Sequence, residues 1–138
     1  GATRPAQDVW FALARSRGMW PLIGYGYWIV VEKASGQFLG EAGFADFKRG
    51  MNPDLSEWPE AGWAFNQLSW GKGYASEAVA TMHAWLDENR PGPSSCIIDS
   101  DNLASRRVAE KSGYEFWCEA LYRDKPVNVF RRAGAGSA

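Results

Sequence analysis

The fold is decided by residues 70–78, which have the sequence WGKGYASEA. Before them lies EAGWAFN (residues 60–66), a short run of aromatic and small residues that predicts a β-strand. After them, apolar residues recur at helical spacing through residue 89, with Tyr74, Ala78, Met82 and Trp85 on one stripe and Ala75, Val79 and Leu86 beside it. The stretch is therefore the turn that leads from a strand into the longest helix of the chain.

The glycines of this turn indicate an anion-binding site. Gly71 and Gly73 let the backbone approach a ligand closely and turn its N–H groups outward. The first turn of a helix carries unpaired amides and a partial positive charge, and Lys72 adds a cation. These features suit a diphosphate, although a bare G-x-G more often makes only a tight turn. A third glycine at the right offset and a GK[ST] are both missing, which excludes the Rossmann and P-loop patterns.

A second motif, DNLASRRVAEKSG, occupies residues 101–113. Asp101 or Asn102 can cap the helix that follows. Asn102 and Ser105 are three residues apart, so both can face one ligand near the helix start. The alternative is a plain helix cap with Ser105 incidental, and for this motif alone that alternative is favoured.

Working outward from these motifs, the pattern predicts an α+β fold. Helices are expected at residues 7–17, 73–89 and 103–111, and strands at 27–33, 37–47, 60–66, 95–99, 114–122 and 126–132. Residues 27–47 and 114–132 form hairpins, so the sheet is mostly antiparallel. The segment 60–99 is a strand–helix–strand crossover, which makes its two strands parallel neighbours.

Two details concern individual side chains of the helices. The first helix places Val9, Trp10, Leu13 and Ala14 on one face, and Gly18 ends it. His83 lies opposite the apolar stripe of the long helix and is expected at the surface.

The sequence contains many tryptophans, and different roles are expected for them. Trp28 and Trp85 are expected in the core. Trp20 and Trp63 can belong to the core or line an acceptor pocket, whereas Trp58 in the polar loop is a candidate acceptor contact.

Composition narrows the possible functions. The chain has 138 residues, 46% hydrophobic and 22% charged, with a formal net charge of −1. This is the balance of one globular domain over residues 1–138, with residues 1–6 and 133–138 expected to be flexible. The net charge argues against nucleic-acid binding, and the longest apolar runs are too short for a membrane span. Cys96 and Cys118 are too few for a disulfide framework, so a cytoplasmic location is expected. One histidine and two distant cysteines make a metal site unexpected.

Taken together, the motifs resemble the GNAT superfamily of acetyl-CoA-dependent N-acetyltransferases, and more narrowly the branch that contains the ribosomal-protein N-terminal acetyltransferases. The family signature [R/Q]-x-x-G-x-[G/A] matches residues 70–75, with Trp70 in its first place. The branch pattern N-x-x-S-x-x-V-x-E-K-x-G-[F/Y] matches residues 102–114, and GYGYW at 24–28 and SGQFLG at 35–40 also resemble the branch. The resemblance covers roughly residues 7–132.

The resemblance implies an acetyl-CoA site and assigns residues to it. The backbone at residues 64–66 would pair with the pantetheine arm like an added strand, and the N–H of Phe65 would polarise the thioester carbonyl. The amides of residues 71–76 would hold the diphosphate, and Asn102 would bind the pantetheine side. The cofactor-binding residues expected on this basis are Ala64, Phe65, Asn66, Trp70, Gly71, Lys72, Gly73, Tyr74, Ala75, Ser76, Asn102 and Ser105.

For catalysis, Glu60 is the preferred general base, acting through a water. The alternatives are that Glu60 is an ordinary surface carboxylate, or that Glu41 on the neighbouring strand is the base. Many relatives carry a tyrosine as general acid where this chain has Ala109. Ser105 is the best-placed hydroxyl for that role, with Tyr114 and Tyr122 as alternatives.

Two other classes of function compete with an N-acetyltransferase. Relatives usually begin with a further strand and helix that this sequence lacks, which favours a module that binds acyl-CoA without turnover. The third interpretation is an interaction protein whose exposed sheet edge pairs with another chain. The same edge, in the hairpin at 27–47, predicts a homodimer. The acceptor amine, whether a protein N-terminus, an amino acid, an antibiotic or a polyamine, cannot be read from the sequence.

Overall fold

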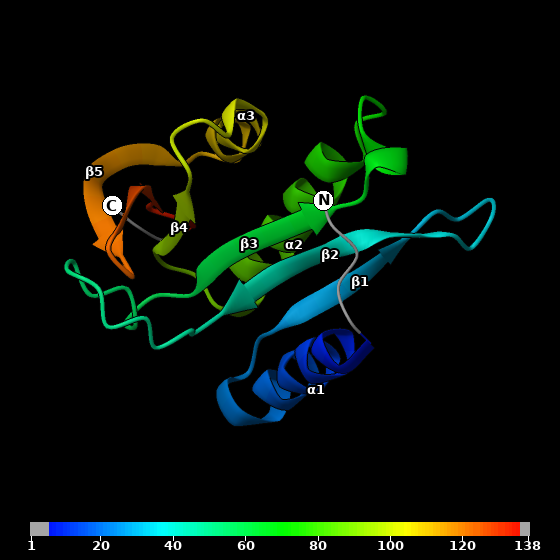
Figure 1. Ribbon diagram of the computed structural model, residues 1–138, viewed down its shortest axis with the longest axis horizontal. Helices are drawn as coiled ribbons and strands as arrows, with labels where there is room; N and C mark the ends of the chain where they lie inside the picture. Colours follow the sequence, from blue (N-terminus) through cyan, green and yellow to red (C-terminus); the bar gives the residue numbers. More distant parts are fainter. Residues whose placement is uncertain (1–5, 136–138) are drawn as a thin grey trace.

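The computed structural model describes residues 6–135, arranged as one six-stranded sheet with helices packed against it (Figure 1). The helices are α1 (Ala6–Ile23), the 3-10 turn η1 (Gln67–Ser69), α2 (Tyr74–Asn89) and α3 (Leu103–Lys111). The strands are β1 (Tyr27–Val31), β2 (Phe38–Ala45), β3 (Glu60–Phe65), β4 (Ser94–Ile98), β5 (Glu115–Tyr122) and β6 (Lys125–Arg132). This element order confirms the predicted one.

The strand order across the sheet is β1-β2-β3-β4-β6-β5. All neighbours are antiparallel except β3 and β4, which the α2 crossover makes parallel, as predicted. Within the described residues, β3 and β4 pair only at Glu60 and Ser95, and the N–H of Ser95 donates to the carbonyl of Pro59 at 3.0 Å. Beyond this point the two strands diverge (Figure 1), so the sheet opens in its middle.

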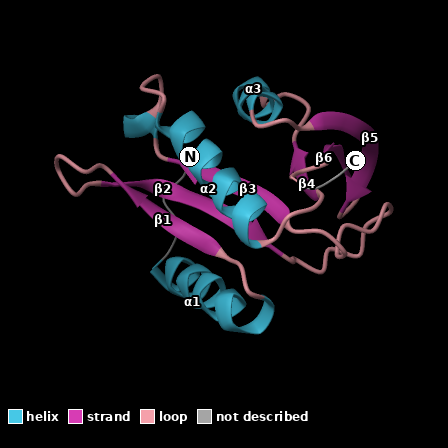
Figure 2. Ribbon diagram, turned by 180° about the vertical axis from the view of Figure 1, so that it is seen from behind, coloured by secondary structure: helices cyan, strands magenta, loops and turns pink. Residues whose placement is uncertain are grey.

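Side-chain alternation gives the sheet two different faces. Ala61, Trp63 and Phe65 of β3 face the main core, where Val79 and Leu86 of α2 are fully buried. Figure 2 shows α2 lying across β3 on this side. Glu60, Gly62 and Ala64 therefore face the opposite side of the sheet. A second, smaller core around Met51, Leu55, Val127 and Val129 packs the loop that joins β2 and β3 against β6.

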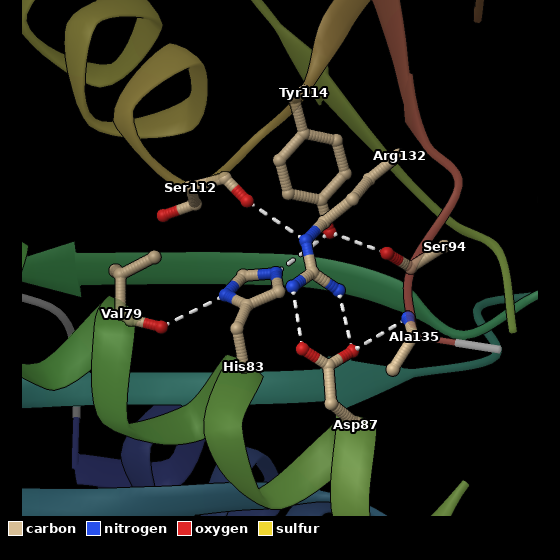
Figure 3. Close-up of polar contacts among 8 residues, drawn as sticks. All are labelled: Val79, His83, Asp87, Ser94, Ser112, Tyr114, Arg132 and Ala135. Carbon is tan, nitrogen blue, oxygen red and sulfur yellow. Dashed lines mark hydrogen bonds and ion pairs between the residues drawn. The ribbon is translucent and has the colours of Figure 1, made fainter. Parts of the chain in front are cut away.

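His83 is buried, which corrects the prediction that it lies at the surface. The buried residues of α2 are Val79, Met82, His83 and Leu86, and all but His83 belong to the predicted apolar face. The cause is a polar partner across the core: His83 Nε2 lies 2.9 Å from the hydroxyl of Tyr114, and that hydroxyl lies 2.8 Å from Ser94 Oγ (Figure 3). A polar side chain is tolerated in a core when hydrogen bonds satisfy it.

Helix α1 is longer than predicted, because Gly18 does not end it. The helix continues to Ile23 even with Pro21 in its last turn. Its continuation places Trp20 against Trp28 and Trp85, with ring centroids 4.9 and 5.3 Å apart. Gly24, at φ +83°, ends the helix in a left-handed turn. Trp28 and Trp85 pack against the main core, as predicted, and Trp20 contacts both of them from the helix.

The predicted apolar face of α1 is largely exposed, since Trp10 is 66% exposed and Leu13 is 44% exposed. The strand beside this helix, β1, is an edge of the sheet. Trp20 covers part of that edge by donating from Nε1 to the carbonyl of Tyr27 at 3.2 Å, and the register shifts between Val30 and Val31.

The last hairpin turns through two residues with positive φ, Arg123 at 52° and Asp124 at 64°. This backbone geometry suits the twist of a two-residue hairpin but strains side chains other than Gly and Asn. At the end of the described chain, the N–H of Ala135 donates to Asp87 at 3.2 Å. Residues 1–5 and 136–138, part of the tails predicted to be flexible, lie outside the described residues. No described helix is long and apolar enough to cross a membrane.

Candidate active site

The opening between β3 and β4 leaves backbone N–H groups of β3 available to an extended ligand. In the β2–β3 ladder, the N–H of Asn66 donates to the carbonyl of Leu39 at 2.8 Å. Hydrogen-bonded and non-hydrogen-bonded pairs alternate along an antiparallel ladder. Alternation from Asn66 therefore turns the N–H and C=O groups of Trp63 and Phe65 away from β2, toward the opening. Phe65 was the residue whose N–H was expected to polarise a thioester.

The glycine turn lies just beyond the end of β3. Gly71 has φ +75° and Gly73 has φ +80°, and a Cβ added to either would meet no atom within 4 Å. Both glycines are thus required by their backbone conformation, and neither is required by crowding. The first bond of α2 runs from the N–H of Glu77 to the carbonyl of Gly73 at 3.0 Å. The amides of Tyr74, Ala75 and Ser76 precede it and have no acceptor inside the helix.

The neighbours of this turn are held by specific hydrogen bonds. Trp70 is 61% exposed, and its Nε1 donates to the carbonyl of Phe65 at 3.3 Å. The Tyr74 hydroxyl donates to Glu32 at 2.6 Å, and this hydrogen bond raises the pKa of Tyr74 and lowers that of Glu32. Lys72 is exposed. The turn is therefore an exposed, amide-rich surface at the end of β3, as the sequence predicts for a diphosphate site.

Asn102 and Ser105 lie together at the start of α3. The side chain of Asn102 caps the helix by accepting from the N–H of Ser105 at 3.1 Å, which confirms the capping prediction. Both residues also line a cleft of about 450 Å³ that reaches Trp63, Glu60 and Tyr122. Capping and facing a ligand are thus compatible here.

Glu60 is buried with only 4% of its surface exposed, so it is not a surface carboxylate. Arg49 donates to both of its oxygens: Nε lies 2.9 Å from Oε1 and Nη2 lies 2.8 Å from Oε2. The Arg49 guanidinium lies over the rings of Phe47 and Tyr122, at 4.5 and 4.6 Å from their centroids. Although burial opposes it, the hydrogen bond and charge of Glu60 hold the pKa of Arg49 above its ordinary value.

Sequence analysis missed Arg49 because it lies in a polar loop without periodicity. The only signal available was a single arginine in a loop that returns to the strand carrying Glu60. Nothing in the spacing of Arg49 and Glu60, eleven residues apart, indicates the pairing.

The candidate hydroxyls separate into two groups. Ser105 and Tyr122 line the cleft, together with Tyr27, whose pKa is raised by burial and by the charge of Glu60. Tyr114, an alternative acid in the sequence analysis, is 2% exposed and hydrogen-bonded to His83 and Ser94. It belongs to the core and cannot reach the cleft. Ala109, at the position of the family's tyrosine, is fully buried in the main core.

Of the remaining candidates, Glu41 and Trp58 are not among the residues that line this cleft. Glu41 is half-buried on β2 opposite Ala64, on the same face of the sheet as Glu60. Trp58 packs against Trp117, with centroids 5.7 Å apart, in the second core region, whereas Trp63 lines the cleft. Among residues 6–135, no group of three or more His, Cys, Asp or Glu side chains could hold a metal ion.

Comparison with known proteins yields one consistent family. The acetyltransferase (GNAT) domain model matches residues 1–115. The chain is 35% identical over 112 residues to uncharacterized protein YkkB of Bacillus subtilis (strain 168), covering 79% of this chain and 63% of that relative. It therefore spans less than two thirds of the relative's length.

Solved structures similar to this chain include a protein assigned to the same family. A protein from Bordetella pertussis, assigned to the GnaT family of acetyltransferases, is 29% identical with a TM-score of 0.87, covering 94% of this chain and 78% of that one. The yncA protein of Salmonella typhimurium, solved with its cofactor acetyl-CoA, has a TM-score of 0.74 over 99% of this chain and 78% of its own. At 17% identity, that likeness shows the fold alone.

Proposed function

The chain belongs to the GNAT acetyltransferase family, as its motifs predicted, and from this membership we propose that it transfers an acetyl group from acetyl-CoA to a primary amine. One observation carries the proposal: β3 leaves β4 after a single paired position, and the free edge of β3 ends at an amide-rich glycine turn. An edge of this kind accepts an extended chain by backbone pairing, and the turn accepts an anion. Coenzyme A offers both groups, a pantetheine arm and a diphosphate.

In the proposed complex, the outward N–H groups of Trp63 and Phe65 pair with the pantetheine arm and polarise the thioester carbonyl. The amides of residues 71–76 hold the diphosphate, and Lys72 adds a mobile positive charge. Asn102 keeps its capping bond through Oδ1 and offers its amide nitrogen to the cofactor. The thioester supplies an activated acetyl group, so the protein needs to position it and to manage two protons.

Glu60 is the proposed base for the acceptor amine. It lies at the cleft, on the face of the sheet opposite α2, where an amine could approach the thioester. Ser105 and Tyr122 are the cleft hydroxyls able to return a proton to the departing thiolate, with Tyr27 beside them. No step in this scheme uses a metal ion, so activity should survive EDTA.

The test measures thiol release from acetyl-CoA with four acceptor classes: peptide N-termini, amino acids, aminoglycosides and polyamines. Calorimetry should show coenzyme A binding on a micromolar scale, roughly −8 kcal/mol. Glu60→Gln should lower kcat/KM by about 10²–10⁴ and leave coenzyme A affinity within about threefold. Absence of coenzyme A binding by the parent protein would end the proposal.

A module that binds acyl-CoA without turnover is the second candidate. Two observations favour it: Ala109 replaces the tyrosine of many relatives, and Arg49 occupies both oxygens of Glu60. Coenzyme A binding without thiol release, across all four acceptor classes, would establish this function instead.

A further inference from the structure

We propose that Arg49 is a positioning residue that keeps Glu60 ionised and aimed at the cleft, and so sets the pH range in which the proposed transferase works. The inference rests on the proposed function, because it concerns the residue assigned there as the base. It goes beyond that function by assigning a role to the loop between β2 and β3.

Three side chains hold the guanidinium of Arg49 in place. Two bonds join Arg49 to the two oxygens of Glu60 in a fork that only arginine can make. Phe47 and Tyr122 enclose the guanidinium with their rings. The Arg49 side chain is 17% exposed and that of Glu60 5% exposed, so solvent screens the pair only weakly.

The loop that carries Arg49 is itself anchored. Met51 and Leu55 are buried against Val127 and Val129 of β6, and Trp58 packs on Trp117 of β5. These contacts hold the guanidinium in one place at the cleft. If Arg49 alone held the loop, its guanidinium could leave the cleft and be solvated by water.

Burial makes a negative charge on Glu60 costly. A carboxylate withdrawn from water is costly to ionise unless an opposite charge or hydrogen bonds favour the charged form. The other ionisable groups that lie near Glu60 or line its cleft are Tyr27 on β1, Glu41 on β2, Cys96 on β4, Tyr122 on β5, the Asp99–Lys125 pair and, in the loop, the Asp46–Lys48 pair and Asp54. Burial and the charge of Glu60 raise the pKa values of Tyr27 and Cys96, so both are neutral near pH 7, and the two cations Lys48 and Lys125 are each paired with an aspartate. Arg49 is therefore the cation that offsets Glu60.

The step it supports is a proton transfer. The acceptor ammonium gives a proton, through a water, to the Glu60 carboxylate, and the free amine attacks the thioester carbonyl. The new C–N bond forms and the C–S bond breaks. The thiolate takes a proton from a cleft hydroxyl, and that hydroxyl recovers a proton from the nitrogen of the intermediate, which leaves a neutral amide and a free thiol. Arg49 stays protonated throughout, and its two bonds keep the carboxylate in the anionic form that can receive the proton.

The experiment compares pH–rate profiles of the parent protein, Arg49→Met and Arg49→Lys, with Glu60→Gln as reference. Arg49→Met removes the charge while keeping most of the side-chain volume. Its kcat/KM should fall at least about tenfold near pH 6 and less than about threefold near pH 9, because the acidic limb moves upward. Arg49→Lys keeps the charge, so its limb should stay in place. Coenzyme A affinity should be unchanged in both variants.

Two further measurements keep the test decisive. Carboxyl carbon NMR on the glutamate-labelled protein reports when Glu60 titrates, with Glu60→Gln giving the assignment, and needs no turnover. In Arg49→Ala, added guanidinium should restore the parent profile by binding between Phe47, Tyr122 and Glu60. This second readout is available if Arg49→Met folds poorly.

The outcomes separate the two proposals. A profile of Arg49→Met that only scales the parent profile, with no movement of the limb and no change in the Glu60 titration, would overturn the role of Arg49. Unchanged kinetics in Glu60→Gln would overturn the choice of base instead. If acetyl transfer is absent, the proposed function fails, while the Glu60 titration still decides whether Arg49 keeps the carboxylate ionised.

Discussion

Protonation of His83 should couple the stability of the fold to pH. His83 is the only histidine of the chain and is 3% exposed. Its Nδ1 lies 2.8 Å from the carbonyl oxygen of Val79, which can only accept, so Nδ1 carries the proton of the neutral ring. Nε2 then accepts from the Tyr114 hydroxyl, and that hydroxyl accepts from Ser94 (Figure 3). With the imidazole neutral, each hydrogen bond in this series has one donor and one acceptor.

The magnitude follows from the shifted pKa. Burial lowers the pKa of His83 from 6.5 to about 4. Because the folded-state pKa is below the unfolded one, the unfolded chain binds the proton first as the pH falls. The contribution is fully present above the unfolded value, is lost as pH falls from about 6.5 toward 4, and totals about 3 kcal/mol. Between about pH 7 and pH 5 alone, the expected loss is roughly 2 kcal/mol.

Urea unfolding at about pH 7, 6 and 5 measures this loss. His83→Gln removes the titrating ring, so its free energy of unfolding should fall by much less over the same range. Tyr114→Phe is the matched control, because it breaks the same hydrogen-bond chain but keeps the histidine; its pH dependence should persist. Parallel losses in the parent protein and His83→Gln would refute the reasoning and assign the effect to carboxylates.

Three other predictions concern the site and the sheet. Gly73→Val should weaken coenzyme A binding at least about tenfold by calorimetry, since φ +80° strains it and its side chain would project toward the diphosphate; Gly36→Val, at φ +72° in an open hairpin turn, should share the strain of about 1–2 kcal/mol but not the loss of binding. Replacing Arg123 and Asp124 by Asn-Gly should raise the free energy of unfolding by about 1 kcal/mol in urea, because that pair prefers the positive φ angles observed there. Light scattering should show a homodimer through the β1 edge, and Ile29→Lys should convert it to monomer; a monomeric parent protein would contradict this.

Sequence reasoning succeeded where the signal was local. The glycine turn, the cap at Asn102 and the helix at residues 103–111 depend on dihedral preferences and spacing that a few neighbouring residues determine. The two hairpins and the parallel pairing of residues 60–66 with residues 95–99 were also predicted correctly, because hairpins join neighbouring strands and a strand–helix–strand unit makes its two strands parallel.

The predictions were wrong or incomplete where contacts between residues far apart in the sequence determine the structure. Gly18 lies inside α1 because tertiary contacts stabilise the turn that follows it. In that turn, Trp20 packs against two other tryptophans, Trp28 and Trp85. His83 was assigned to the surface from the helix pattern alone, whereas Tyr114, thirty-one residues away, makes burial possible. The pairing of Arg49 with Glu60 is of the same kind, since it is created by the return of a loop.

The divergence of β3 from β4 connects the binding edge with the proposed base. Glu60 is the paired residue of β3, and the open edge begins directly after it. Phe65 lies five residues farther along the strand and Trp63 three, which at about 3.3 Å per residue puts Trp63 roughly 10 Å from Glu60. A glutamate side chain and one water together span most of that distance, so Glu60 can serve, through a water, a thioester held at Trp63. A thioester held at Phe65, roughly 16 Å along the strand, would lie beyond that reach, so the proposed base requires the thioester at Trp63. Moving the carboxylate two residues along β3, in a Glu60→Gln, Gly62→Glu variant, would collide with the Tyr27 hydroxyl, which already occupies the space of a Gly62 Cβ. Of these two positions on β3, residue 60 is therefore the one that leaves room for both the water and the acceptor.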